Sequence, residues 1–302
     1  MKFSGSRKVA VIGEVLFDVF PDYEKLGGAP FNFASHLRAL GFIVDFISRI
    51  GIDEKGRKII ERSEKNGLEP GGIQKDPEKA TGRVVVSLDK SGTPSYNIVK
   101  DTAYDNLDPA VVKERLSRTS PSLLYFGTLI QRTENGRKVI EEALSFLSED
   151  TKVFCDLNLR PECYSEETVK NSLANCDILK LNSEELEEIS AMPGISPGKE
   201  KARGLMEKFG ISLLCETRGA DGAVLFSEEN EIRMPAPPVK NMKDSVGAGD
   251  SFAAALAAGL LLGWSEKKAL ASALDLASKV CSIEGAVPDN DDIYNSFMKT
   301  KG

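Results

Sequence analysis

Cysteine and histidine, on which many metal and redox sites depend, are scarce in this chain of 302 residues. The five cysteines form no Cys-x-x-Cys pair and are odd in number, so we expect reduced, structural thiols in the cytoplasm rather than a disulfide framework or a zinc site. His36 is the only histidine, which excludes a histidine cluster as a metal site. We expect His36 to contribute to packing or to the surface and not to catalysis.

The chain also lacks an excess of basic residues, a long apolar run and an apolar leader. Lys and Arg number 39 against 46 Asp and Glu, a formal net charge of −7, which disfavours non-specific binding to nucleic acid or to an anionic membrane. The longest apolar run, residues 252–262, has 11 residues and is too short to span a bilayer. Residues 1–7 contain no apolar signal core. We therefore expect a cytoplasmic globular protein without membrane or nucleic-acid partners.

Two common phosphate-binding motifs are missing as well. The sequence contains no GxxxxGK[ST], which excludes a P-loop enzyme. Gly247-x-Gly249 resembles the start of a dinucleotide fingerprint, but Phe252 stands at the third glycine position and Asp250 would repel a pyrophosphate. The sequence therefore lacks the fingerprint of a nicotinamide-dependent dehydrogenase.

Short apolar runs alternate with helix-like stretches along most of the chain, which predicts an α/β fold with a mostly parallel central sheet flanked by helices. Two β-rich runs, residues 83–88 and 95–99, flank the turn at 89–92 and interrupt this order as an antiparallel hairpin. Without repeats or a linker, we expect one domain over residues 1–302, with a small β-rich lid from about 14–29 and 80–106. The other expected strands are 9–12, 42–50, 123–127, 153–156, 178–181, 213–217 and 223–226, and the expected helices are 31–40, 54–66, 134–147, one from 183, 250–262 and 266–280.

The glycine-rich stretch DSVGAGDSF, residues 244–252, runs into an Ala/Leu-rich helix. At a helix start, the backbone N–H groups of Gly247, Ala248 and Gly249 favour an anion, because they lack intrahelical partners and lie at the positive end of the helix dipole. Asp250 then stands beside the bound group and can accept a proton from an attacking hydroxyl. Taken alone, the same residues also suit an ordinary glycine turn with Asp250 as the helix N-cap.

A second polar stretch lies near the N-terminus, in GEVLFD, residues 13–18, and GGAPFN, residues 27–32. Asp18 can accept from two hydroxyls and Asn32 can both donate and accept, which suits a polyhydroxylated ligand. Gly27 and Gly28 let the backbone approach a ligand closely. By itself this stretch is more typical of a glycine turn before a helix, with Asn32 in the first turn and Pro30 as the N1 residue.

Together and in this order, the two stretches resemble the ribokinase-like (pfkB) carbohydrate kinases, whose signature D-[ST]-x-G-A-G-D-[ST]-F matches residues 244–252 in full. The segment GEVLFDVFP…GGAPFNFA is similar to the fructokinase branch. The resemblance implies a ribokinase-like fold and transfer of the γ-phosphoryl group of ATP to a sugar hydroxyl. It also implies that Asp250 is the catalytic base and that Gly247, Ala248 and Gly249 form the anion hole.

Further positions take their expected roles from the same resemblance. Arg160 lies in DLNLRP, similar to a D-x-N-x-R element near the sugar, where it would bind a sugar oxygen or a phosphate. Asn182 and Glu185 match an N-x-x-E motif that holds Mg²⁺ through waters. The remaining assignments are Thr217, Gly219 and Gly222 for a nucleotide-binding turn, and Asp244, Val246 and Gly285 for a monovalent cation such as K⁺.

The resemblance favours fructose as acceptor, because the form Gly28-Ala29-Pro30-x-Asn32 looks like the fructokinases. A 2-keto-3-deoxygluconate kinase and a nucleoside or ribose kinase on the same fold are the alternatives. A sugar-sensing regulatory protein without activity is the non-enzyme alternative, although such a protein would be expected to lose Asp250 or the glycines. A homodimer is left open.

Overall fold

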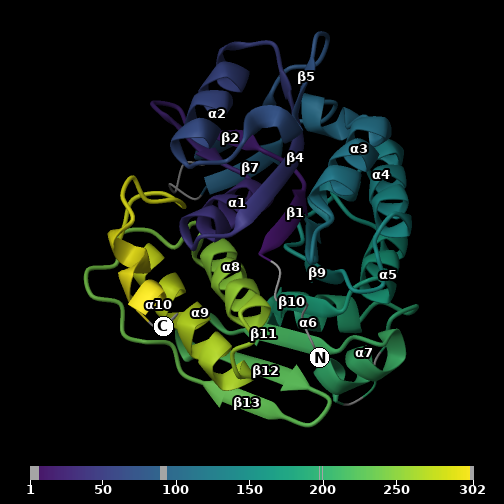
Figure 1. Cartoon of the computed structure of the whole chain (residues 1–302), viewed down its shortest axis with the longest axis vertical. Helices are drawn as coiled ribbons and strands as arrows, with labels where there is room; N and C mark the ends of the chain where they lie inside the picture. The colour runs from purple at the N-terminus through teal and green to yellow at the C-terminus, as the bar shows by residue number, and fades with distance from the viewer. Residues whose placement is uncertain (1–6, 89–93, 197, 199, 300–302) are drawn as a thin grey trace.

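A nine-stranded sheet covered by helices forms the body of the protein in the computed structural model, which describes residues 7–88, 94–196, 198 and 200–299 (Figure 1). The strand order is β13-β12-β11-β10-β9-β8-β1-β4-β5, parallel from β11 to β5, with β12 and β13 added antiparallel at one edge. The strands are β1 (Lys8–Ile12), β4 (Ile43–Gly51), β5 (Ile73–Asp76), β8 (Leu123–Gly127), β9 (Lys152–Asp156), β10 (Ile178–Asn182), β11 (Leu213–Thr217), β12 (Ala223–Ser227) and β13 (Glu231–Met234).

Both faces of strands β1, β8 and β12 are buried, which is why these strands are mostly apolar. In β1, Val9 and Val11 enter one hydrophobic core, whereas Ala10 and Ile12 enter the other, as the period of two requires. The first core is covered by α1 (Ala29–Ala39), α2 (Glu54–Lys65), α8 (Ala248–Leu261), α9 (Glu266–Val280) and α10 (Asn295–Lys299). The second is covered by α3 (Pro109–Thr119), α4 (Glu134–Ser145), α5 (Glu166–Ala174), α6 (Ser183–Ser190) and α7 (Lys201–Phe209).

A second, smaller sheet of four strands has the order β3-β2-β6-β7 and lies at the opposite end of the molecule from β13 (Figure 1). Its strands are β2 (Leu16–Val19), β3 (Glu24–Gly27), β6 (Gly82–Leu88) and β7 (Pro94–Ile98). The antiparallel β6–β7 pairing confirms the predicted hairpin, while its predicted turn at 89–92 lies outside the described residues. Parallel pairing of β2 with β6 joins residues 16–19 to residues 82–85, two segments that are far apart in the sequence.

A buried ion pair fixes the base of the small sheet. Arg132, which follows β8, donates to Asp105 at 2.6 Å and to the carbonyl of Val99, just after β7, at 2.7 Å. The side chains of Arg132 and Asp105 are 5% and 3% exposed. Because each charge would be left uncompensated without the other, the chain segments that carry them are held together at this point.

The sequence-derived ranges agree with the observed helices and strands, with shifts of one or two residues at most ends. One shift matters for function. Helix α8 begins at Ala248 with Gly247 as its N-cap, so Asp250 lies inside the first turn and is not the N-cap. The reading of Asp250 as an ordinary cap is therefore wrong. In the part of the chain that the structure describes, no helix is long and apolar enough to cross a membrane.

Candidate active site

Several residues of the candidate site follow the carboxyl ends of the parallel strands, which meet along one edge of the large sheet. Glu14 comes two residues after β1, and Gly127 at the end of β8 is level with Asp156 at the end of β9. Asn182, at the end of β10, is level with Thr217, at the end of β11. Segments between residues 14 and 217 of the chain thus come together at one edge.

The glycine turn forms the start of α8. Gly247 adopts φ 78°, a left-handed conformation that glycine enters without strain, and Ala248, Gly249 and Asp250 form the first helical turn. First-turn N–H groups have no partner within a helix and point toward its N-terminal end. The N–H of Ala248 makes a long bond of 3.3 Å to the Ser245 carbonyl, which an anion could replace. The turn can therefore bind phosphoryl oxygens.

One hydrogen bond connects this turn with the predicted sugar site. The Nδ2 of Asn32, on α1, donates to Oδ2 of Asp250 at 2.8 Å. This assignment of the amide leaves Oδ1 of Asn32 buried and, among the described residues, without a hydrogen-bond donor. That oxygen can accept from a ligand hydroxyl close to Asp250.

Asp18 and the two glycines lie together at the start of α1. A Cβ on Gly27 would lie 3.2 Å from Oδ2 of Asp18, so the glycine leaves the carboxylate accessible. Gly28 has φ 111°, and a Cβ there would lie 2.7 Å from the Glu14 carbonyl, so this position requires glycine. Burial raises the pKa of Asp18, and the charges of Arg160 and Lys25 oppose this.

The ionisation of Asp250 depends on the groups around it. Burial raises its pKa, which would favour the neutral acid. The hydrogen bond from Asn32 and the positive charges of Lys180 and Arg160 oppose that effect. Arg160 is exposed, and its guanidinium makes a long bond of 3.5 Å to the Leu159 carbonyl. It is thus positioned to act on the site through its charge.

Lys180, which the sequence analysis did not single out, lies beneath the glycine turn. Its ammonium donates to both carboxylate oxygens of Asp156 at 2.9 Å, and both side chains are buried. A Cβ on Gly249 would lie 3.4 Å from that ammonium. Burial disfavours the charge on Lys180, but Asp156, Glu185 and Asp250 outweigh this and raise its pKa. Asp156 is fully buried beneath the site, so its partner is Lys180 rather than a ligand. A lysine inside the apolar run ILKL was the available signal.

Asn182 and Glu185 form a capping box at the start of α6. Oδ1 of Asn182 accepts from the N–H of Glu185, and Oε2 of Glu185 accepts from the N–H of Asn182, both at 2.8 Å. Oε1 of Glu185 accepts from the N–H of Leu159 at 2.7 Å, which ties α6 to the segment that carries Arg160. Each oxygen retains a second lone pair, so the two residues suit a magnesium ion bound through water rather than directly.

The predicted nucleotide turn joins β11 to β12. Gly219 and Gly222 both have positive φ, 56° and 94°, and a Cβ on Gly222 would lie 2.0 Å from the Met234 carbonyl. Oγ1 of Thr217 donates to the Leu181 carbonyl at 3.3 Å, directly beside Asn182. The turn therefore lies on the same sheet edge as the capping box.

The residues predicted to bind a monovalent cation lie on two neighbouring segments, since the N–H of Lys243 donates to the Cys281 carbonyl. Asp244 accepts from the N–H of Val246 at 3.0 Å and from the ammonium of Lys25, on β3, at 3.2 Å. Gly285 has φ 76°. A cation would share the Asp244 carboxylate with the Lys25 ammonium.

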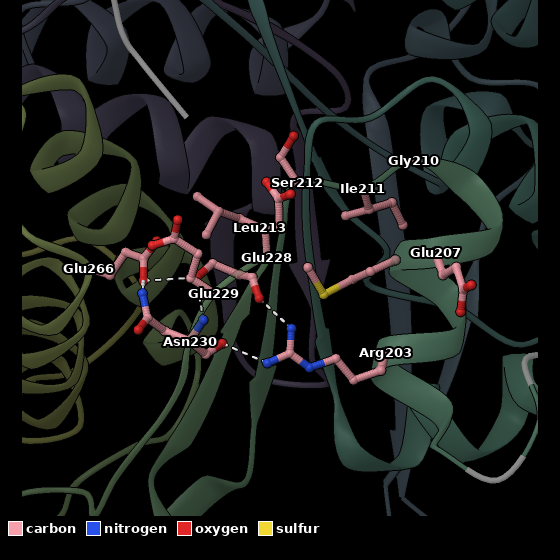
Figure 2. A pocket seen from close by; sticks show the side chains of 12 residues that line it. Arg203, Glu207, Gly210, Ile211, Ser212, Leu213, Glu228, Glu229, Asn230 and Glu266 are labelled. Atoms are coloured by element: carbon pink, nitrogen blue, oxygen red, sulfur yellow. Dashed lines mark hydrogen bonds between the residues drawn. The ribbon is translucent and has the colours of Figure 1, made fainter.

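A separate pocket of about 660 Å³ lies between α7, the β12–β13 turn and α9 (Figure 2). Arg203 donates to the carbonyls of Ser227 and Asn230, and the side chains of Ser227 and Asn230 donate to Glu266. None of the predicted site residues lines it. These hydrogen bonds connect α7, the β12–β13 turn and the start of α9, so we assign the polar groups a structural role.

Comparisons with known proteins show the family and the fold. The model of the pfkB family carbohydrate kinases matches residues 6–293. A fructokinase of Klebsiella pneumoniae is 29% identical over 310 residues, covering 96% of this chain and 99% of its own. A 5-dehydro-2-deoxygluconokinase of Geobacillus thermodenitrificans is 27% identical, with 91% and 85% covered. A fructokinase structure from Vibrio cholerae, bound to fructose, ADP and calcium ion, superposes with a TM-score of 0.81 at 23% identity, covering 97% of this chain and 99% of that one.

Glu14 is a further residue that the sequence analysis did not assign. It is 3% exposed, and its Oε2 has no hydrogen-bond partner among the described residues. Burial raises its pKa to about 7, the charge of Asp250 adds to this, and the arginines at 160 and 132 oppose it. A charged residue two positions after a buried strand, at the edge where ligands bind in such sheets, was the available signal.

Replacing Glu14 by Gln is expected to change how stability depends on pH. The carboxyl titrates around 4.5 when unfolded and about 7 when folded, so the folded state holds the extra proton between these values. As pH rises through this window, from about 4.5 to about 7, the free energy of unfolding of the wild type should therefore fall relative to that of the Gln variant. Above pH 7 the loss should amount to roughly 3 kcal/mol. Urea unfolding across the window measures this, with exposed Glu149→Gln as control. A constant difference between Glu14→Gln and wild type would contradict the prediction.

Proposed function

The chain belongs to the pfkB family of carbohydrate kinases, and from this premise we propose that it transfers the γ-phosphoryl group of ATP to a hydroxyl of a small neutral sugar, with fructose as the first candidate. The observation that carries the proposal is the 2.8 Å hydrogen bond between Asn32 and Asp250. It joins the amide that we assign to sugar binding to the carboxylate that we assign as proton acceptor, directly at the glycine turn.

The acceptor binds between Asp18, Asn32 and the backbone of Gly27 and Gly28, and presents one hydroxyl to Asp250. That hydroxyl oxygen attacks the γ-phosphorus, and its proton passes to Asp250. As the new O–P bond forms, the bond from the γ-phosphorus to the bridging oxygen breaks, and ADP leaves with the electron pair. The N–H groups at the start of α8 stabilise the charge that develops on the phosphoryl oxygens.

Lys180 supplies a buried positive charge beneath the same turn. It offsets the repulsion between Asp250 and the transferred group, so that Asp250 stays ionised and able to accept the proton. When bound, Mg²⁺ neutralises the ATP phosphates, and Asn182 and Glu185 would hold its water ligands. Thr217, Gly219 and Gly222 form the nucleotide side of the site. The five free cysteines suit the reducing cytoplasm, where we place the protein.

The charges around the acceptor favour a neutral sugar. Asp18, Glu14 and Asp250 are acidic, and Arg160 is the cation whose charge acts on all three. A sugar acid would bring a further carboxylate into this group, and a desolvated carboxylate needs a cation of its own. The identity to the Klebsiella fructokinase over nearly the full chain also supports fructose.

The acceptor is tested by ADP release with a panel of substrates. We expect kcat/KM to be highest for fructose and lower for ribose, nucleosides, 2-keto-3-deoxygluconate and 5-dehydro-2-deoxygluconate. The last two should be disfavoured because their carboxylates would face the acidic residues Asp18, Glu14 and Asp250. Higher kcat/KM for either acid would show that Arg160 outweighs the acidic residues. No release above background with any acceptor would refute the kinase itself.

Replacement of Asp250 by Asn retains the shape of the side chain but removes the proton acceptor. We expect kcat to fall by roughly 10²–10⁴, the usual contribution of general-base catalysis. ATP affinity should persist, because the backbone donors of the turn remain. Steady-state kinetics and calorimetric ATP titration measure the two effects.

Asp150→Asn is the matched control, since Asp150 is exposed in the turn before β9. It should leave both quantities unchanged. Near-native kcat in Asp250→Asn would remove Asp250 from the role of base.

We also propose that the small sheet acts as a lid over the sugar, because β2 carries Asp18 and β3 carries Lys25, which reaches Asp244. A closed lid would keep water from the γ-phosphate. Hydrogen exchange in β2, β3, β6 and β7 should slow when sugar is added, while α7, distant from the site, should not change. If these strands exchanged equally fast without sugar and at saturating sugar, the result would argue against the lid.

A further inference from the structure

His36 and Asn32 lie one helical turn apart on α1, so their side chains project from the same face of the helix. Asn32 reaches the catalytic carboxylate, as described above. His36 is fully buried and reaches the segment that follows α9. The first helix therefore contacts two different parts of the phosphoryl-transfer site.

The hydrogen bonds of His36 determine which ring nitrogen carries the proton. Nε2 lies 2.9 Å from the carbonyl oxygen of Ala286, and a carbonyl can only accept, so Nε2 is the protonated nitrogen. Nδ1 lies 2.7 Å from the hydroxyl of Tyr294 and therefore accepts from it. Burial lowers the pKa of His36 to about 4, so the ring is neutral near pH 7. A neutral imidazole with both nitrogens bonded has one fixed orientation.

Ala286 in turn packs against the glycine turn. A Cβ on Gly247 would lie 2.4 Å from the Cβ of Ala286 and 2.5 Å from its Cα. The back of the turn is thus in direct contact with the residue whose carbonyl His36 holds. Any displacement of Ala286 would change the surface against which Gly247 rests, and with it the direction of the N–H groups that follow.

The other contacts that hold this segment are closer to water. Arg62, on α2, donates to the Val287 carbonyl at 3.1 Å and pairs with Asp289, whose side chain is 78% exposed. Exposed ion pairs contribute little to fixing a structure. The bond from His36 is a buried one, so it determines the position of Ala286 more strictly.

We propose that His36 is a positioning residue for phosphoryl transfer, which orients the anion-binding turn through the carbonyl of Ala286. The inference rests on the proposed phosphoryl transfer. It gives α1 two linked tasks: Asn32 restrains the base, and His36 restrains the turn that binds the transferred group. Because the N-terminus of the same helix forms the sugar site, the acceptor, the base and the anion turn share one rigid support.

The test compares His36→Leu with His36→Gln. Leu fills a similar volume but cannot donate, whereas the amide of Gln can still reach the Ala286 carbonyl with an N–H. We expect His36→Leu to lower kcat by roughly 10- to 100-fold, the scale on which small misplacements act, with KM for the sugar little changed. His36→Gln should restore most of the activity. Thermal unfolding of both variants sets an assay temperature at which each is folded.

A second measurement does not require the correct sugar. Mg-ADP is titrated with and without aluminium fluoride, which mimics the phosphoryl group in transfer. Wild type and His36→Gln should bind ADP more tightly with the fluoride, and His36→Leu should lose this gain while binding ADP alone normally. Because no acceptor is needed, an error in the proposed sugar leaves this comparison valid.

Ala286→Gly provides a variant that leaves the His36 bond in place and removes the Cβ against Gly247. We expect it to lose part of the same fluoride gain, since the turn loses its support. The proposal is overturned if folded His36→Leu keeps the wild-type kcat and fluoride gain, or if His36→Gln fails as completely as His36→Leu. In either case the donor to Ala286 would not govern the turn.

Discussion

For the proposed phosphoryl transfer, one carboxylate must stay ionised beside other carboxylates, and the rest of the site depends on this constraint. Asp250 is drawn toward the neutral acid by burial, and an anionic phosphoryl group would draw it further. The protein opposes this with one hydrogen bond, from Asn32, and two cations, Lys180 beneath and Arg160 at the surface. The buried Lys180–Asp156 pair is therefore more than a structural ion pair, because its positive end lies next to the glycine turn.

The second requirement of the proposed function is that the N–H groups of the glycine turn point in a fixed direction. Preorganised donors stabilise a transition state because they need no rearrangement when charge develops. Here the turn is held by α8 on one side and by the Ala286 segment on the other. Helix α1 contacts both, through Asn32 and His36, so parts of the chain more than 200 residues apart behave as one unit.

Some residues of the ligand-binding motifs serve the fold at the same time. Glu185 uses both carboxylate oxygens on backbone N–H groups, at the start of α6 and at Leu159. Buried and bonded in this way, it fixes two loops at the sheet edge before any metal or nucleotide binds. A change there would thus alter the geometry of the loops as well as any contact with water-bound magnesium.

The sequence by itself determined the α/β order, the lid hairpin and the glycine turn, because periodicity, glycine spacing and helix starts are local properties. It also predicted Asp250, Asn32 and Asp18 as site residues. The 2.8 Å hydrogen bond between Asn32 and Asp250, the placement of Lys180 under Gly249, and the burial of Glu14 and His36 were decided by the tertiary structure alone. The pKa of Glu14 and the tautomer of His36 depend on neighbours distant in sequence, such as Arg160 and Ala286, which only the packed sheet and helices bring within reach.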